Sequence, residues 1–177
     1  ESRGQRTLDI GAGAGILAVV LALKRKDAKV FASDVSARAL SVARRNARRH
    51  GVADRIAFVQ GDLFQPFRAR QEGPFDLIVS NPPYVMEATL ETLAPEVRDY
   101  EPREALVGGK DGLRVVTPIL QESPAFLVPG GWLLVEMDPG QIEAARSVSE
   151  ATAAYQAVEV IQDYSGSPRV LCVQKKA

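Results

Sequence analysis

The sequence predicts an α/β fold, in which seven strands form a mostly parallel sheet with crossover helices and the last strand is antiparallel. Two observations predict it. Short apolar runs alternate with longer amphipathic segments, as in parallel sheets with helical crossovers. The chain then ends on two strands joined by a short Gly/Ser/Pro turn, a connection that only antiparallel strands can make. The length of 177 residues favours a single domain, residues 1–177.

Four apolar runs in the first half of the chain predict strands at residues 7–10, 29–34, 55–60 and 75–80. A helix is expected after the first strand, at residues 15–24. Ser36 can cap a second helix, and Gly51 can end it. The apolar positions on the expected buried side of this second helix are Ala37, Leu40, Ala43 and Ala47.

The second half of the chain is less regular. Residues 82–110 have no clean periodicity and predict a long loop or broken helices, which in compact domains is often functional. Asp111-Gly112 predicts the start of a helix that runs to about Val128, disturbed at its two prolines. A turn at residues 129–131 is expected next, followed by a strand at 132–137, a helix at 141–152 and strands at 157–161 and 169–173.

Composition excludes several classes of protein. Formal net charge is zero and the pI is about 6.9, so no bulk field holds the domain on nucleic acid. The single cysteine, Cys172, excludes an internal disulfide and fits the cytoplasm. No apolar run approaches the ~20 residues of a membrane span. His50 and Cys172 offer no metal ligand set. Because the chain starts at Glu1 rather than Met, we expect it to be part of a longer protein.

A glycine-rich loop follows the first strand and predicts a nucleotide cofactor. Gly11, Gly13 and Gly15 permit unusual backbone angles and close approach to a ligand. The loop fits the G-x-G-x-x-G/A pattern, with Asp34 about 20 residues on, placed to accept hydrogen bonds from ribose hydroxyls. Taken alone, the pattern fits a nicotinamide cofactor or S-adenosylmethionine. The alternative to a cofactor loop is a plain turn that binds no ligand.

Two further acids favour S-adenosylmethionine. Asp9, two residues before the first glycine, suits a methionine ammonium and would be badly placed beside a pyrophosphate. Asp62, after the third strand, could accept a hydrogen bond from an adenine amine, with Leu63 or Phe64 on the ring face. The alternative for Asp62 is an ordinary helix-cap or turn residue.

Asn81-Pro82-Pro83-Tyr84 follows the fourth strand and predicts the chemistry. The Asn81 side chain and the Pro82 carbonyl can accept both N–H groups of a planar amine, and Tyr84 can stack on it. Asn81 would then face the methyl group of the cofactor, and in-line transfer would depend mainly on positioning and desolvation. The alternative is a strand that ends in a Pro-Pro turn with a core tyrosine.

Five segments together carry a resemblance that covers essentially the whole chain: the glycine-rich loop, residues 81–84, 100–106, 109–113 and 163–170. They resemble the HemK/PrmC family. The resemblance implies a Rossmann-like class I methyltransferase that converts S-adenosylmethionine to S-adenosylhomocysteine while methylating a glutamine amide (N5) of class I peptide-chain release factors. The family's N-terminal helical docking domain and a segment before the first strand are absent from this chain. Residues 136–141 also depart from the family's register.

Two other functions stay open. One is methylation of an exocyclic amine of adenine or guanine in RNA or DNA, with the base flipped into the pocket; net neutrality counts against it. The other is an inactive cofactor-binding interaction module, against which the intact Asn81–Tyr84 corner argues. The arginine-rich helix at 37–49 is more simply a solvated face. Glu101 and Arg103 could line the substrate entrance or form a salt-bridged loop. A monomer is expected.

Overall fold

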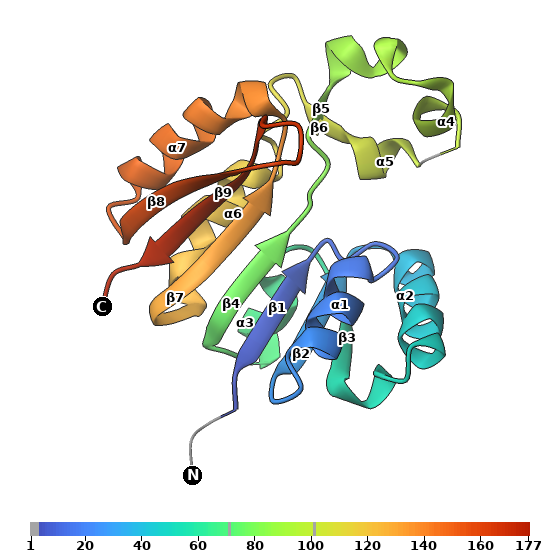
Figure 1. Cartoon of the computed structure of the whole chain (residues 1–177), viewed down its shortest axis with the longest axis vertical. Coiled ribbons are helices and arrows are strands. Elements are labelled where there is room, and N and C mark those ends of the chain that lie inside the picture. The colour runs from blue at the N-terminus through green and yellow to red at the C-terminus, as the bar shows by residue number, and fades with distance from the viewer. Residues whose placement is uncertain (1–3, 71, 101) are drawn as a thin grey trace.

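The computed structural model describes residues 4–70, 72–100 and 102–177, and one sheet forms its centre (Figure 1). Its strands are β1 (Arg6–Ile10), β2 (Lys29–Asp34), β3 (Ile56–Gln60), β4 (Phe75–Ser80), β7 (Leu127–Glu136), β8 (Tyr155–Gln162) and β9 (Pro168–Lys175). The order is β3-β2-β1-β4-β7-β9-β8. Of these seven strands, β9 runs antiparallel to both of its neighbours and the other pairs are parallel. The predicted sheet is therefore confirmed.

Helices cover both faces of the sheet. Those on one face are α1 (Ile16–Lys24) and α2 (Ala37–Arg49); those on the other are α3 (Gln65–Arg70), α6 (Val116–Glu122) and α7 (Ile142–Ala151). Alternation along β2 shows the division, because Val30 and Ala32 pack with α1 and α2, whereas Phe31 packs edge-on against Phe67 of α3. None of the described helices is long and apolar enough to cross a membrane.

Residues 85–100 and 102–109 form a small lobe beyond the carboxyl end of β4 (Figure 1). Strands β5 (Val85–Met86) and β6 (Val107–Gly109) pair in parallel. Between them lie a 3₁₀ turn (Glu87–Thr92), α4 (Pro95–Arg98) and α5 (Arg103–Leu106), and Leu90, Leu106 and Val107 form the lobe's own core. The prediction of broken helices is confirmed, but the two short strands were not predicted.

Two predicted boundaries are wrong. The helix expected over residues 111–128 is only α6, followed by a 3₁₀ turn at Ser123–Ala125. Residues 111–113 instead form a turn, in which the Asp111 side chain accepts from the Leu113 N–H and Gly112 has φ +76°. Strand β7 begins at Leu127 and includes the expected 129–131 turn as a bulge, since Phe75 pairs with Leu127 and Leu77 already with Trp132.

The second helix largely follows its prediction. Ser36 caps α2 by accepting from the Ala39 N–H, and Leu40, Ala43 and Ala47 are buried. Ala37, the first residue of the helix, was expected on the buried side and is exposed instead. The six-residue helix α3 was not predicted, since it is too short to show a helical period.

We expect Gly15→Ala to destabilise the fold more than Gly51→Ala. Both glycines have positive φ (+79° and +68°), which costs an L residue about 1–2 kcal/mol. A Cβ at Gly51 would meet no atom within 4 Å, whereas one at Gly15 would lie 2.8 Å from the Ala43 Cβ, where α1 crosses α2. That overlap adds about 1–3 kcal/mol. Urea unfolding of both variants measures the difference; equal losses would contradict the close contact.

Candidate functional site

A cavity of about 650 Å³ opens at the carboxyl ends of β1 to β4. Open α/β sheets bind their ligands at this edge. Residues predicted from four separate segments line it: Gly11, Gly13, Asp34, Asp62, Leu63, Asn81 and Pro83. The structure therefore brings the predicted cofactor loop and the start of the Asn81–Tyr84 corner into one cavity.

The glycine-rich loop has an open main chain on the cavity side. Gly11 and Gly13 have φ of +69° and +54°, and a Cβ on either would meet nothing within 4 Å. The loop is held from behind by a bond from the Ala12 N–H to the Ser33 carbonyl (2.9 Å). Gly15 differs, because it caps α1 against Ala43 and does not line the cavity. Packing between the two helices therefore explains this third glycine.

Asp34 links the loop after β1 to the turn before α2. One carboxylate oxygen accepts from the Gly13 N–H and the other from the Ser36 N–H, each at 2.8 Å. A carboxylate oxygen has more than one acceptor position. Asp34 can therefore hold the loop in place and still accept a hydroxyl group from a ligand in the cavity.

Asp9 lies beneath the loop and is 1% exposed. Its Oδ2 accepts from the Ala18 N–H at 3.0 Å, whereas no described residue bonds its Oδ1. Burial raises the pKa of Asp9 to about 7, the Ala18 N–H opposes this rise and the charge of Asp34 adds to it. A cationic ligand group above the loop would favour the ionised form. Asp9 does not itself line the cavity, so its charge would act on a ligand through the loop.

We expect Asp9 to make the free protein less stable as pH rises. The folded protein retains this proton up to about pH 7, whereas the unfolded chain releases it near its ordinary value of 3.8. The free energy of unfolding should therefore fall between about pH 4 and pH 7, by a few kcal/mol at about 1.4 kcal/mol per pKa unit. Asp9→Asn, which keeps an acceptor for Ala18, should lack this slope. Urea unfolding across that range tests it, and parallel pH profiles would contradict a raised pKa.

The turn after β3 presents Asp62 and Leu63 to the cavity. Leu63 has φ +43°, a left-handed conformation that costs roughly 1–2 kcal/mol and is often found at functional sites. Phe64 was the other candidate for a ring-face contact, but it is fully buried and stacked on Phe126 at 4.5 Å. Phe64 is therefore a core residue, and Leu63 is the apolar side chain available to a ligand.

The Asn81–Tyr84 corner begins at the end of β4, where a side-chain hydrogen bond joins β4 to β1. The Ser80 hydroxyl donates to the Ile10 carbonyl at 2.8 Å, which brings the corner beside the glycine-rich loop. Asn81 is exposed and Pro83 half-buried in the cavity wall, whereas Pro82 and Tyr84 are not among the lining residues. Burial, and then the charge of Glu136, raise the pKa of the Tyr84 phenol, and Arg169 opposes them. The stacking of Tyr84 on a planar substrate group stays a prediction.

Residues of the lobe and of the segment after it close the far side of the cavity; three of them belong to segment 100–106, which carried the resemblance, but none was predicted to line a site. They are Pro102, Glu104, Ala105, Arg114 and Val115. Arg114 is held by its bond to the Val107 carbonyl at 2.8 Å. Of the two predicted entrance residues, Glu101 lies outside the described residues and Arg103 is not in the wall.

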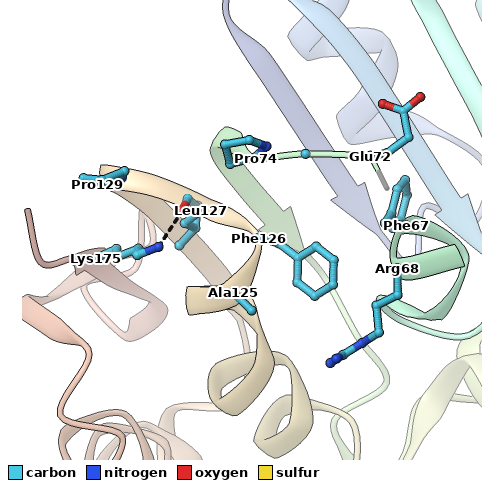
Figure 2. Close-up of a pocket in the computed structure, with 10 residues that line it drawn as sticks. Phe67, Arg68, Glu72, Pro74, Ala125, Phe126, Leu127, Pro129 and Lys175 are labelled. Atoms are coloured by element: carbon cyan, nitrogen blue, oxygen red, sulfur yellow. Dashed lines mark hydrogen bonds between the residues drawn. The ribbon is translucent and has the colours of Figure 1, made fainter. Parts of the chain in front are cut away.

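A second cavity, of about 470 Å³, lies at the opposite end of the sheet (Figure 2). Phe67, Phe126 and Leu127 form its apolar part. The charged groups around it are already paired: Arg68 with Glu122, Glu72 with Arg6, and Lys175 with the Leu127 carbonyl. It contains none of the predicted site residues, so the cavity at the carboxyl ends of the strands is the candidate site.

Comparisons with known proteins show the family of the chain. The family model of the methyltransferase small domain matches residues 1–96. The release factor glutamine methyltransferase of Geobacter sulfurreducens is 45% identical over 164 residues, and that of Chlorobaculum tepidum is 46% identical over 165. Each alignment covers 93% of this chain, and the chain spans 56% and 55% of the two relatives' own lengths.

Solved structures show the same fold. A methyltransferase from Pyrococcus furiosus has a TM-score of 0.73 at 24% identity, covering 98% of this chain and 76% of its own. The ribosomal protein L11 methylase of Lactobacillus delbrueckii has a TM-score of 0.68 at 21% identity, covering 99% and 72%. The predicted Rossmann-like class I methyltransferase fold is therefore confirmed.

Proposed function

Since this chain belongs to the methyltransferase small domain family, we propose that residues 1–177 are the catalytic domain of an S-adenosylmethionine-dependent enzyme that methylates a glutamine side-chain amide in class I peptide-chain release factors. One observation carries the proposal. A single cavity contains both the open glycine-rich loop and Asn81. The curated relatives with this chemistry in their names support the choice of substrate.

The cavity residues fit S-adenosylmethionine. Gly11 and Gly13 leave main chain accessible, Asp34 can accept ribose hydroxyls, and Asp62 with Leu63 can receive the adenine. The buried, unpaired Oδ1 of Asp9 places a potential negative charge under the loop, which suits a cationic methionine moiety. When bound, this cofactor supplies an activated methyl group on a sulfonium. S-adenosylhomocysteine would be its product.

The chain's own contribution is to hold the substrate amide. The Asn81 side-chain oxygen and the Pro82 carbonyl accept its two N–H groups and so fix the direction of its nitrogen. Pro83 contributes apolar surface at the same wall. No strong base is required before transfer, so positioning and the exclusion of water supply most of the acceleration. The protonated amide can lose its extra proton to solvent after transfer.

The remaining parts of the proposal concern the cell. We place the protein in the cytoplasm, where release factors act, and its single cysteine, Cys172, is free and buried. We propose that it acts as a monomer. Methylation of a base in RNA or DNA is the alternative; the arginines of α2 are the feature that favours it, and zero net charge disfavours it.

The test is transfer of labelled methyl groups from S-adenosylmethionine. The acceptors are a class I release factor, its variant with the target glutamine replaced by alanine, tRNA and rRNA. We expect label on the wild-type factor alone. Label on RNA would keep the methyltransferase and overturn the substrate. Calorimetric binding of the cofactor without transfer to any acceptor would favour an inactive binding module.

A further inference from the structure

The Asn81–Tyr84 corner needs an anchor at its far end. Among the described residues, no side chain hydrogen-bonds to the Asn81 amide, which is therefore available to substrate. The direction of this amide must then be set by the backbone on either side. Ser80 fixes the near end through the Ile10 carbonyl. The far end is Tyr84, whose carbonyl accepts from the Gln141 side chain at 2.7 Å.

Gln141 bridges segments that are far apart in the sequence. Its Nε2 donates to the carbonyls of Tyr84 (2.7 Å) and Asp111 (3.3 Å), and its Oε1 accepts from the Asp138 N–H (3.2 Å). The side chain is buried, with the whole residue 5% exposed. Both N–H groups of this amide donate and its oxygen accepts one bond, so the orientation of the side chain is fixed.

The position of Gln141 is itself rigid. It ends the 3₁₀ turn Pro139–Gln141, in which Asp138 accepts from the Gly140 N–H at 2.9 Å. The next residue, Ile142, begins α7 and is buried in the main core. The bridge therefore connects the corner to a helix packed on the sheet.

Two glycines, Gly108 at the end of the lobe and Gly112 just after it, allow this close approach. A Cβ at Gly112 would overlap the Gln141 amide and the Tyr84 carbonyl. A Cβ at Gly108 would lie 2.6 Å from the Pro83 carbonyl. The backbone of residues 108–112 therefore lies directly against the corner, and a side chain at either position would displace it.

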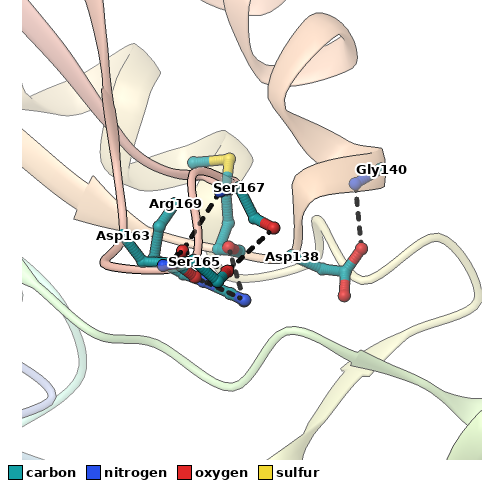
Figure 3. A network of polar contacts seen from close by, with 7 residues as sticks. Asp138, Gly140, Asp163, Ser165, Ser167 and Arg169 are labelled. Carbon is teal, nitrogen blue, oxygen red and sulfur yellow. Dashed lines mark hydrogen bonds and ion pairs between the residues drawn. The ribbon is translucent and has the colours of Figure 1, made fainter.

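Burial raises the pKa of the Tyr84 phenol, and the charge of Arg169, beside the β8–β9 turn, opposes this rise. Figure 3 shows how Arg169 is held, by Asp163 Oδ2 (3.3 Å) and the Met137 carbonyl (3.5 Å). Asp163 is fixed in turn by Ser165 and Ser167, and these bonds lower its pKa to about 2.

We propose that Gln141 is a positioning residue for methyl transfer, which holds the Tyr84 carbonyl so that Asn81 and the Pro82 carbonyl face the substrate amide. The methyl transfer that Gln141 would serve rests on the proposed function, whereas its hydrogen bonds to Tyr84, Asp111 and Asp138 are seen in the structure. Gln141 does not line the cavity, so it acts on the site through the backbone that it holds at Tyr84 and Asp111. Its loss should lower kcat and leave cofactor binding unchanged.

The test compares Gln141→Glu with Gln174→Glu. Gln174 makes the same kind of bond, to the Gly130 carbonyl at 2.9 Å, at the opposite end of the sheet. An ionised carboxylate at position 141 would face two carbonyl oxygens, whereas its protonated form can still donate to one. We expect kcat to fall by about 10- to 100-fold at pH 8, with the Kd of S-adenosylmethionine within about 2-fold of wild type. Gln174→Glu should retain kcat.

The Gln141→Glu variant should also acquire a pH dependence. Burial and the neighbouring Asp111 and Asp138 would raise the pKa of the new carboxyl, and Arg169 would lower it. Activity relative to wild type should therefore recover as pH falls from 8 to 6, which a general loss of folding would not produce. Gln141→Met keeps the volume without the bonds, and should lose kcat at every pH.

Amide hydrogen exchange separates this proposal from the proposed function. Both Gln141 variants should expose the Tyr84 and Val85 amides to faster exchange, while Gln174→Glu should not, whether or not the wild-type protein methylates a release factor. An inactive wild-type protein with this exchange pattern would overturn the proposed function and retain the bridge. Wild-type exchange and kcat in both Gln141 variants would overturn the positioning role.

Discussion

Replacing Asn81 by alanine is expected to reduce kcat by about 100-fold or more, because one of the two acceptors that hold the substrate amide is lost. Asn81 is exposed in the cavity wall and bonds to no other described side chain, so its removal should not disturb the fold. The Kd of S-adenosylmethionine should change by less than about 3-fold, since the loop and Asp34 are untouched. Steady-state turnover and calorimetry measure the two quantities.

Asn46→Ala is the matched control, with the opposite expectation. The Asn46 amide donates to the Ala14 carbonyl at 2.9 Å and so supports the glycine-rich loop from α2. Its loss should weaken cofactor binding and leave kcat at saturating cofactor near the wild-type value. Normal turnover in Asn81→Ala would remove the role that we assign to the corner.

Asp34→Ala is expected to weaken S-adenosylmethionine binding by about 10- to 100-fold, because a bond to a charged group contributes about 1.5–3 kcal/mol. Two effects combine here. The Gly13 and Ser36 N–H groups lose the carboxylate that fixes them at 2.8 Å, and the ribose loses its acceptor. Calorimetry on folded protein, verified by circular dichroism, measures the change.

Asp27→Ala serves as the control for loss of an acid, since Asp27 is exposed in the turn between α1 and β2 at the opposite end of the sheet. Its affinity for S-adenosylmethionine should equal that of wild type. An unchanged affinity in Asp34→Ala as well would mean that the ribose is held elsewhere.

The sequence was sufficient for the sheet because each strand has a local signature. The run 75–80 is mainly apolar and is followed by Asn81 and a proline pair, and residues 29–34 end at an acid. The pairing between strands that are distant in the chain was harder to predict from the sequence. The bulge that lets β7 begin at Leu127 depends on its register with Phe75, and Pro129-Gly130-Gly131 has the local pattern of a turn. Asp111-Gly112 likewise resembles a helix start, although Gly112 is required by its contact with Gln141.

The candidate site likewise has residues that the sequence could predict and residues that it could not. Gly11 and Asn81 directly follow parallel strands and Asp34 ends one, so the topology alone brings them to one edge. Glu104 and Arg114 come from the lobe and the segment after it, whose packing has no periodic signal. Gly15 fitted the glycine-rich motif and Phe64 was a candidate for the adenine face; both also have packing contacts, with Ala43 and Phe126, that the sequence did not predict.

The most direct measurement is a crystal structure with S-adenosylhomocysteine bound. The ribose should contact the Asp34 carboxylate, the adenine should lie against Leu63, and the sulfur should face the Asn81 side chain in the cavity at the carboxyl ends of the strands. A ligand in the cavity beside Phe126, or one that meets the loop but lies away from Asn81, would contradict the single site on which the proposed transfer depends.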